Sequence, residues 1–223
     1  MLSGMMQKGD FVRINYIGRL ESEEIFDLTY EDMAKKENIY NPNVPYKPVP
    51  IILGAGFIIK GIDNAVLSMD VGDKKTFEVK PEDGFGQRNP KFVRVVPNKV
   101  FKQNNIEPRQ GMVVDFSGIK GRIQSVSSGR IMVDFNNPLA GKTLKYELEV
   151  VEKIEEPKQK ILSILEFYGI NKAEIKISED EAEVETQTLP VELKKRVSQL
   201  ITEYVKAGDN VIKKVKFTEV FQA

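Results

Sequence analysis

The sequence predicts an α+β protein with a sheet-and-helix domain, an inserted β-rich module and a C-terminal α+β domain. Strand-like segments surround one amphipathic helix in the first part, with the strands expected at 11–20, 75–80 and 146–154 and the helix at 57–69. Between 87 and 136, short apolar runs recur roughly every 8–12 residues, which is typical of a small β module. The last part follows the order helix, strand, strand, helix, strand.

The first strand, at 11–20, shows apolar residues that alternate with polar ones. The chain extends again at 25–27. A proline-rich connection follows at 28–50, in which we expect a short helix with Asp32 near its start. Connections of this length inside a compact domain are often functional.

The amphipathic helix follows a short strand at 51–53. Its apolar residues repeat at helical spacing and are Ile58, Ile62, Ala65, Val66 and Met69. Val71-Gly72-Asp73 ends the helix and turns the chain into the next strand. The stretch lacks an obvious nucleophile or metal ligand. Its apolar side chains therefore predict a pocket that works by shape and by backbone groups.

In the inserted module, Ser127-Ser128-Gly129 predicts a hairpin turn. Residues 155–159 read as a linker. Beyond them we expect helices at 160–168 and 190–207, two strands joined by a turn at 178–180, and a closing strand at 210–221 that includes Val220.

The composition excludes several classes of function. The 223 residues carry 33 basic and 33 acidic side chains, and this balance favours neither nucleic acid nor an anionic membrane as the main partner. Cysteine and histidine are absent, which excludes thiol nucleophiles, Ser-His catalysis and the usual zinc sites. No stretch approaches the roughly 20 apolar residues of a membrane span. We expect a cytoplasmic protein.

An ordered set of motifs resembles the FKBP-type peptidyl-prolyl cis-trans isomerases. The motifs are Tyr16-Ile17-Gly18, Phe26-Asp27, Ile58-Ile59-Lys60-Gly61-Ile62, Val71-Gly72-Asp73, Asp83-Gly84-Phe85-Gly86 and the run from Leu144 to Val150. The insertion, framed by GFGQ and NNPLAGKTLKY, looks like the insert-in-flap chaperone module of SlyD-like members. With its C-terminal extension, the whole chain resembles the long archaeal members. The implied domains are 6–86 plus 137–155 for the isomerase, 87–136 for the insert, and 156–223 for the C-terminal domain.

The resemblance implies a pocket between a curved antiparallel sheet and one helix. By motif position, its walls would be Tyr16, Phe26, Asp27, Ile58, Ile59, Ile62, Phe85, Leu139 and Tyr146. Ile62 stands where many members carry Trp, and Phe85 where many carry Tyr. Either Val49 or Ile51 would complete the wall. Asp27 would be a buried carboxylate bonded to a donor such as Tyr16, because a buried unpaired charge is costly.

The implied reaction is rotation about an X-Pro amide, which needs no bond cleavage and therefore no cofactor or metal. The backbone N–H of Ile59 would hold a substrate carbonyl, and the 28–50 connection would overhang the pocket entrance. The insert would add affinity for unfolded, proline-containing polypeptides, its expected partners. Two alternatives remain: a non-catalytic chaperone or binding module with the same shell, and an RNA-associated factor, suggested by Lys213-Lys214-Val215-Lys216.

The C-terminal domain carries more apolar residues than its small sheet is expected to bury. They are Val191, Val197, Leu200, Ile201, Tyr204 and Val205 on the second helix, and Val211, Val215, Phe217 and Val220 on the closing strand. Exposed apolar patches often mark partner surfaces. We therefore expect a symmetric homodimer through this domain.

Overall fold

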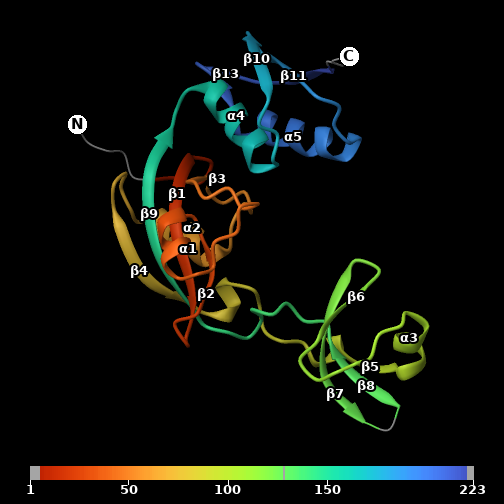
Figure 1. Ribbon diagram of the computed structural model, residues 1–223. Coiled ribbons are helices and arrows are strands. Elements are labelled where there is room, and N and C mark those ends of the chain that lie inside the picture. The colour runs from red at the N-terminus through yellow and green to blue at the C-terminus, as the bar shows by residue number, and fades with distance from the viewer. Residues whose placement is uncertain (1–5, 128, 220–223) are drawn as a thin grey trace. The chain divides into compact units, whose positions relative to one another are not determined.

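The computed structural model describes residues 6–127 and 129–219 (Figure 1). The chain forms two compact units, one made of Met1–Val79 with Leu144–Ala223 and the other of Lys80–Thr143. The predicted α+β class is confirmed. The C-terminal part belongs to the same compact unit as the first domain, and its separation as a domain of its own stays a prediction.

A five-stranded antiparallel sheet forms the framework of the first unit. Its strands are β1 (Phe11–Leu20), β2 (Ile25–Leu28), β3 (Val49–Ile52), β4 (Lys74–Val79) and β9 (Leu144–Ile154). The order is β2-β1-β9-β4, and β3 also pairs with β1. The strands predicted at both ends of the domain are therefore present, and β9 lies between β1 and β4. This register brings Tyr146 opposite both Gly18 and Phe77.

The helix α2 (Lys60–Val66) is shorter than the predicted 57–69. Ile59 is its N-cap, with the extended angles φ −62 and ψ 147, so the residues before it are not helical. Gly61 lets α2 lie against β4, since a Cβ added there would lie 2.6 Å from Val79 Cγ1. Side chains alternate along a strand, so Val79 shares a face with Phe77. The helix α2 therefore lies on the face that carries Phe77.

The helix α1 (Glu31–Lys36) forms near Asp32, as predicted. Ala34 on this helix joins a small core with Ile17 and Leu28, and Tyr30, Met33 and Tyr46 pack against that core. Ile17 alternates with Tyr16 along β1 and therefore points to the opposite face of the sheet. Tyr30, Met33 and Tyr46 therefore lie on the face away from Tyr16, and the expectation that the 28–50 connection overhangs the pocket stays a prediction.

The second unit is a small β-rich module with its own core, as predicted. Its elements are η1 (Pro81–Asp83), η2 (Pro90–Phe92), β5 (Val93–Pro97), α3 (Asn98–Gln103), β6 (Val113–Phe116), β7 (Ile119–Ser127) and β8 (Arg130–Asp134). The sheet order is β5-β8-β7-β6. The core contains Phe101, Val114, Ile123, Ile131 and Val133. Ser128 of the predicted hairpin turn lies outside the described residues, although β7 and β8 flank it.

Residues 100–106, VFKQNNI, contain one of the short apolar runs that predict strands in the inserted module, and this prediction is wrong because residues 98–103 are helical. The chain forms α3 there after Pro97, whose φ of −61 suits a residue at the start of a helix. Phe101 on α3 is buried and meets Phe116 edge-on, with 5.7 Å between ring centroids. The helix thus supplies a large apolar side chain to a core that four short strands alone would leave thin.

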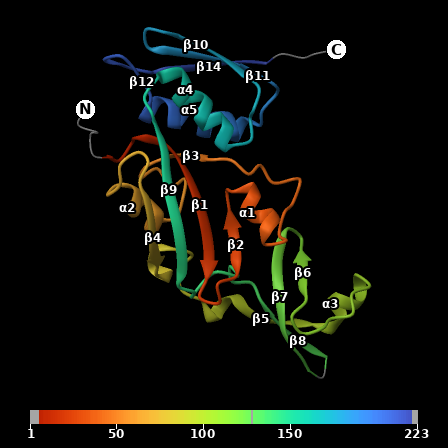
Figure 2. The ribbon, with the colours of Figure 1, turned by 60° about the vertical axis from the view of Figure 1, so that its left-hand side comes forward.

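The C-terminal part confirms the predicted order helix, strand, strand, helix, strand (Figure 2). Its elements are α4 (Pro157–Phe167), β10 (Ala173–Ser178), β11 (Glu181–Thr186), α5 (Val191–Tyr204), the short pair β12 (Lys206–Ala207) and β13 (Asn210–Val211), and β14 (Lys214–Glu219). The strand β14 pairs in parallel with β11.

Three boundaries in the C-terminal part differ from the prediction. The predicted linker at 155–159 is wrong from Pro157 onward, where α4 begins. The Glu156 carboxylate caps this helix by accepting hydrogen bonds from its first N–H groups. The helix α5 ends at Tyr204 rather than 207, since Val205 is already extended. The closing strand is divided into β13 and β14, and Val220 lies outside the described residues.

Most of the apolar side chains that were expected to exceed what the small C-terminal sheet can bury are nevertheless buried, with the help of the first sheet. Val197, Leu200, Ile201 and Val205 are all buried. They belong to a core that also contains Phe11, Ile52 and Ile154 of the first sheet. The C-terminal helices therefore complete their burial against β1, β3 and β9. Val191 and Val211 remain exposed.

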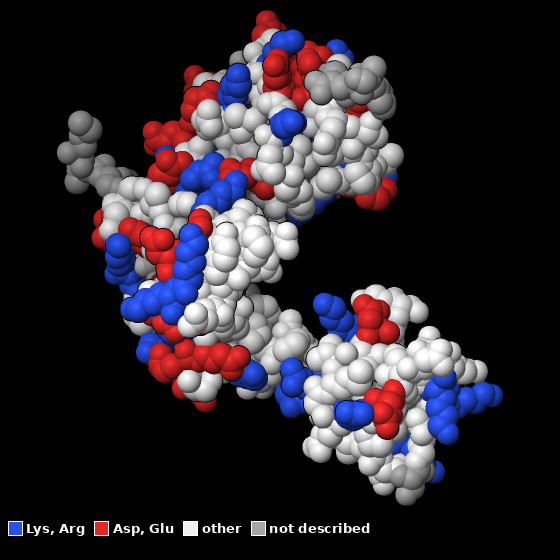
Figure 3. Space-filling model, in the orientation of Figure 1, with Lys and Arg blue, Asp and Glu red and all other residues white. Residues whose placement is uncertain are grey.

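Acidic and basic side chains are interspersed on the face shown in Figure 3. In the basic segment before and within β14, Lys213 pairs with Asp180 at 3.3 Å and Lys216 with Glu183 at 3.0 Å. This pairing weakens the RNA-associated alternative, since these charges already have protein partners. No helix in residues 6–127 and 129–219 is both long and apolar enough to cross a membrane.

An ion cluster links α4 to the first sheet. Glu166 accepts Arg13 Nη2 at 2.7 Å and Lys47 Nζ at 2.5 Å. Burial raises the pKa of the Glu166 carboxyl, but the hydrogen bonds and charges of Arg13 and Lys47 outweigh burial and hold the pKa below its ordinary value. The ionised form is therefore favoured in the folded state.

We expect Glu166→Gln to reduce the free energy of unfolding by about 1–2 kcal/mol at pH 7. Because the folded pKa is the lower one, this stabilisation is complete above the ordinary Glu pKa of about 4.3 and is lost as pH falls through the folded value. Urea unfolding at pH 7 and pH 3 measures it. Glu152→Gln is the control: Glu152 also pairs with Arg13, but its side chain is 54% exposed against 18% for Glu166. A difference from wild type that does not shrink between pH 7 and pH 3 would contradict the assignment.

Candidate active site

Tyr146 lies at the centre of an aromatic cluster on the sheet face that carries α2. Its ring meets Tyr16 and Phe26 edge-on, with centroids 6.1 Å and 5.8 Å away, and stacks on Phe77 at 6.2 Å. The rings come from β1, β2, β4 and β9, which the sheet order places side by side. Tyr146 is buried, whereas the other three rings are partly exposed. Three of these four residues were predicted. Phe77 was missed, although its place two residues before Val79 in an alternating strand was a usable signal.

Gly18 makes room for Phe26. A Cβ added to Gly18 would lie 2.6 Å from Phe26 Cζ, closer than real contacts allow. The register between β1 and β2 also shifts at Gly18 and Arg19. Together the missing side chain and the irregular register allow the Phe26 ring to lie across β1 toward Tyr146.

The Tyr16 hydroxyl donates a hydrogen bond to Asp27 Oδ2 at 2.9 Å. Burial, followed by the charge of Asp27, raises the pKa of the Tyr16 hydroxyl well above its ordinary value. Tyr16 therefore stays a neutral donor at any physiological pH. The expected partner of Asp27 is present, but Asp27 itself is exposed rather than buried. Water therefore solvates part of the Asp27 carboxylate, which was expected to be stabilised by protein groups alone.

Ile58 and Ile59 are half-buried at the entrance to α2, and Ile62 within the helix is 1% exposed. The carbonyl of Ile59 accepts the N–H groups of Ile62 and Asp63 at 3.0 and 3.2 Å. For the N–H of Ile59, no acceptor is found among residues 6–127 and 129–219. A half-buried donor without a partner is available to a ligand carbonyl, since unpaired buried donors are costly.

Phe85 and Leu139 belong to the second unit, and their assignment to the pocket wall stays a prediction. Both are half-buried, and near them the N–H of Gly141 donates to the Gly86 carbonyl at 2.8 Å. Of the two alternatives in β3, Val49 is half-buried and Ile51 is buried. Ile51 is thus a core residue, and Val49 is the one whose side chain retains some access.

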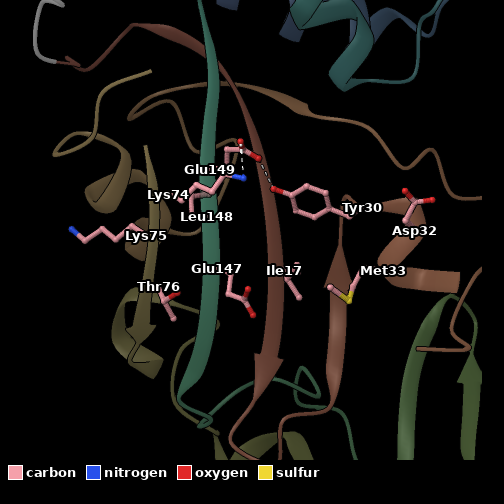
Figure 4. Close-up of a pocket in the computed structure, with 10 residues that line it drawn as sticks. All are labelled: Ile17, Tyr30, Asp32, Met33, Lys74, Lys75, Thr76, Glu147, Leu148 and Glu149. Carbon is pink, nitrogen blue, oxygen red and sulfur yellow. Dashed lines mark hydrogen bonds and ion pairs between the residues drawn. The ribbon is translucent and has the colours of Figure 1, made fainter. Parts of the chain in front are cut away.

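A hollow of about 410 Å³ lies on the opposite face of the first sheet, beside α1 (Figure 4). There the Tyr30 hydroxyl donates to Glu149 Oε2 at 2.6 Å, and Lys74 Nζ pairs with Glu149 at 3.2 Å. The hydrogen bond from Tyr30 lowers the pKa of the Glu149 carboxyl, and Lys74 lowers it further. Together they outweigh burial, which raises this pKa. The sequence did not predict this hollow, because its lining comes from strands and a helix that only the fold brings together.

The aromatic cluster can bind an apolar ring and hold a carbonyl, but it offers no nucleophile. Tyr146, Phe26 and Ile62 provide apolar surface, and the Ile59 N–H is a donor, whereas the proton of the Tyr16 hydroxyl is already donated to Asp27. Asp27 is placed to fix the Tyr16 hydroxyl rather than to exchange protons with a ligand. The arrangement suits chemistry that proceeds by binding and desolvation.

Comparison with known proteins finds similarity along much of the chain. Residues 94–139 match the family described as "FKBP26, IF domain". Over 146 residues, the chain is 36% identical to the short-type peptidyl-prolyl cis-trans isomerase of Methanocaldococcus jannaschii, covering 66% of this chain and 92% of that protein. It is 32% identical over 131 residues to the FKBP-type isomerase SlyD of Helicobacter pylori, covering 56% and 70%. It is 31% identical over 132 residues to the FKBP-type 16 kDa isomerase of Escherichia coli, covering 57% and 86%.

Proposed function

The chain belongs to the FKBP-type peptidyl-prolyl cis-trans isomerases, and on that premise we propose that the cluster around Tyr146 binds and twists the X-Pro bond. The predicted family and its isomerase activity are confirmed by these similarities. The observation that supports this location is the convergence of Tyr16, Phe26 and Tyr146 on one face, with the Tyr16 hydroxyl fixed by Asp27.

The proposed mechanism rests on the polarity of the amide. A planar X-Pro amide is charge-separated, and rotation passes a barrier of about 18–20 kcal/mol. An apolar surface formed by Phe26, Ile62 and Tyr146 disfavours the planar form and so favours the twisted, less polar one. The Ile59 N–H would hold a substrate carbonyl while the bond turns. A ten-thousand-fold acceleration needs about 5.5 kcal/mol, within reach of desolvation and one hydrogen bond.

A coupled isomerisation assay on a prolyl tetrapeptide tests this site. We expect Phe26→Ala to reduce kcat/KM by about ten-fold or more, because it removes the ring beside Tyr146. Asp27→Ala should have a similar effect by freeing the Tyr16 hydroxyl. Ile25→Ala is the matched control, since Ile25 is next to Phe26 in β2 but packs against the core formed by Ile17 and Leu28. Full activity of folded Phe26→Ala and Asp27→Ala would refute the location.

The second unit is proposed to bind unfolded chains. Its exposed large apolar residues are Phe92, Val95, Met112, Val113, Ile119, Val126 and Met132. Val95 and Met132 face each other across β5 and β8, on the side opposite the buried Ile131 and Val133. Exposed apolar groups in such number favour contact with other chains. If the protein were only a chaperone, it would aid refolding without accelerating isomerisation of the tetrapeptide.

A homodimer through the C-terminal part is the remaining proposal on partners. It is supported by exposed Val191 and Val211 and by β14, which lies at an edge of its sheet. Sedimentation of the full chain should show a dimer, and the double variant Val191→Lys, Val211→Lys should be monomeric. A monomeric wild type would rule the dimer out. Removing residues after 155 is a poorer test, because Phe11 and Ile52 would lose their packing partners. The cytoplasmic location stays a prediction.

A further inference from the structure

We propose that Phe167, at the end of α4 in the C-terminal part, is a positioning residue for isomerisation. It holds Phe57 and thereby the pocket loop, residues 54–59, which delivers Ile58 and Ile59 to the site. This inference rests on the proposed function of Ile58 and Ile59. It assigns the C-terminal part a role in catalysis on the same chain.

Both ends of the pocket loop are fixed within the first domain. At the start, Gly54 adopts a φ of +76, and the N–H of Ala55 donates to the Ile52 carbonyl of β3 at 3.2 Å. At the other end, the Ile59 carbonyl accepts the N–H groups of Ile62 and Asp63. The loop is therefore bonded to β3 at its start and to α2 at its end.

The middle of the loop is held by the C-terminal part. The Phe57 ring lies 4.3 Å from that of Phe167, tilted by 52°, and 6.4 Å from that of Tyr168. Ala55 and Phe57 also pack against the core shared with α4 and α5. Phe57 immediately precedes Ile58, and adjacent Cα atoms are only about 3.8 Å apart. A shift of the Phe57 ring is therefore passed directly to Ile58 and the Ile59 N–H.

The helix α4 gives the loop a firm support. Ile161, Ile164 and Leu165 on α4 are fully buried in the shared core. Glu166, next to Phe167, is bonded to Arg13 on β1 and to Lys47. The turn of α4 that touches Phe57 is thus bound to the sheet whose other residues line the site. Phe57 rests on a surface with a fixed position relative to Tyr16.

The experiment compares Phe167→Ala with Val215→Ala. Val215 on β14 packs against the same core and contributes to stability, but it is not part of the Phe57 ring cluster. At a temperature where both variants are folded, we expect Phe167→Ala to lower kcat/KM on a prolyl tetrapeptide by about three- to ten-fold. The backbone amides of Ile58 and Ile59 should show lower NMR order parameters in this variant. Val215→Ala should change neither, and Phe167→Tyr should restore activity to within about two-fold.

A purely structural role of Phe167 makes a different prediction. Both variants would then lose stability while keeping wild-type kcat/KM and wild-type order parameters at Ile59, and that result would overturn the proposal. If Phe167→Ala does not fold, Phe167→Leu removes the ring but keeps an apolar side chain and allows the same comparison. A wild type that is inactive on the peptide would refute the proposed function, whereas the order parameters at Ile59 would still decide whether Phe167 positions the loop.

Discussion

Replacing residues 88–135 with a short flexible linker is expected to leave peptide isomerisation intact and to slow catalysed refolding of a proline-limited protein by about a hundred-fold. A pocket for one proline binds an unfolded chain weakly. A second site on the same molecule raises the local concentration of the chain to about the millimolar range. The tetrapeptide is too short to use both sites, so only refolding depends on the module.

The two chain segments that flank the module lie next to each other, which suits this replacement. The Gly141 N–H donates to the Gly86 carbonyl at 2.8 Å, so the chain leaves and returns at adjoining points. The Asn136 side chain accepts the Asn89 N–H at 2.8 Å and donates to the Asn89 carbonyl at 3.1 Å, so the two ends of the segment to be replaced lie next to each other. Shortening a surface loop changes the closure entropy only slightly. The core around Phe101 is removed as a whole rather than exposed.

Two assays on the same preparations measure the effect: tetrapeptide isomerisation and refolding limited by a proline. The matched variant is Val95→Ser with Met132→Ser, which keeps the module and its core but removes two facing apolar side chains from its outer surface. It should lower refolding activity partway and leave peptide activity unchanged. A parallel fall of both activities in the shortened protein would show that the module supports the pocket itself.

Much of the fold could be predicted because local patterns determine it. Alternation in 11–20 and 146–154 gave β1 and β9, and the turn at Val71-Gly72-Asp73 separated α2 from β4. The start of α2 was misplaced because Ile58 and Ile62 fit helical spacing whether or not Ile58 is helical. The helix α3 was missed because its six residues are too few to show a period.

The site was predictable only through the family's motif set. Tyr16, Phe26 and Tyr146 come from three strands, and their meeting depends on cross-strand register that a single sequence does not reveal. The contacts that the sequence could not indicate are those between distant segments. Phe57 with Phe167, and Arg13 with Glu166, are separated by more than a hundred residues and follow no local pattern.

Ile59→Pro is expected to reduce kcat/KM on the tetrapeptide by about ten- to a hundred-fold more than Ile59→Ala does. The φ of Ile59 is −62, close to the angle of about −65 that proline requires. Its N–H has no acceptor among the described residues, so proline breaks no hydrogen bond found in the structure. Both substitutions remove the isoleucine side chain, but only proline removes the N–H.

The difference between the two variants therefore isolates the donor. An amide N–H that meets a carbonyl in a desolvated site contributes about 1–3 kcal/mol, which sets the expected ratio. Proline disfavours helical angles at the residue before it, and Ile58 precedes the helix, so α2 should remain intact. Equal activity of folded Ile59→Pro and Ile59→Ala would mean that the substrate carbonyl is held elsewhere.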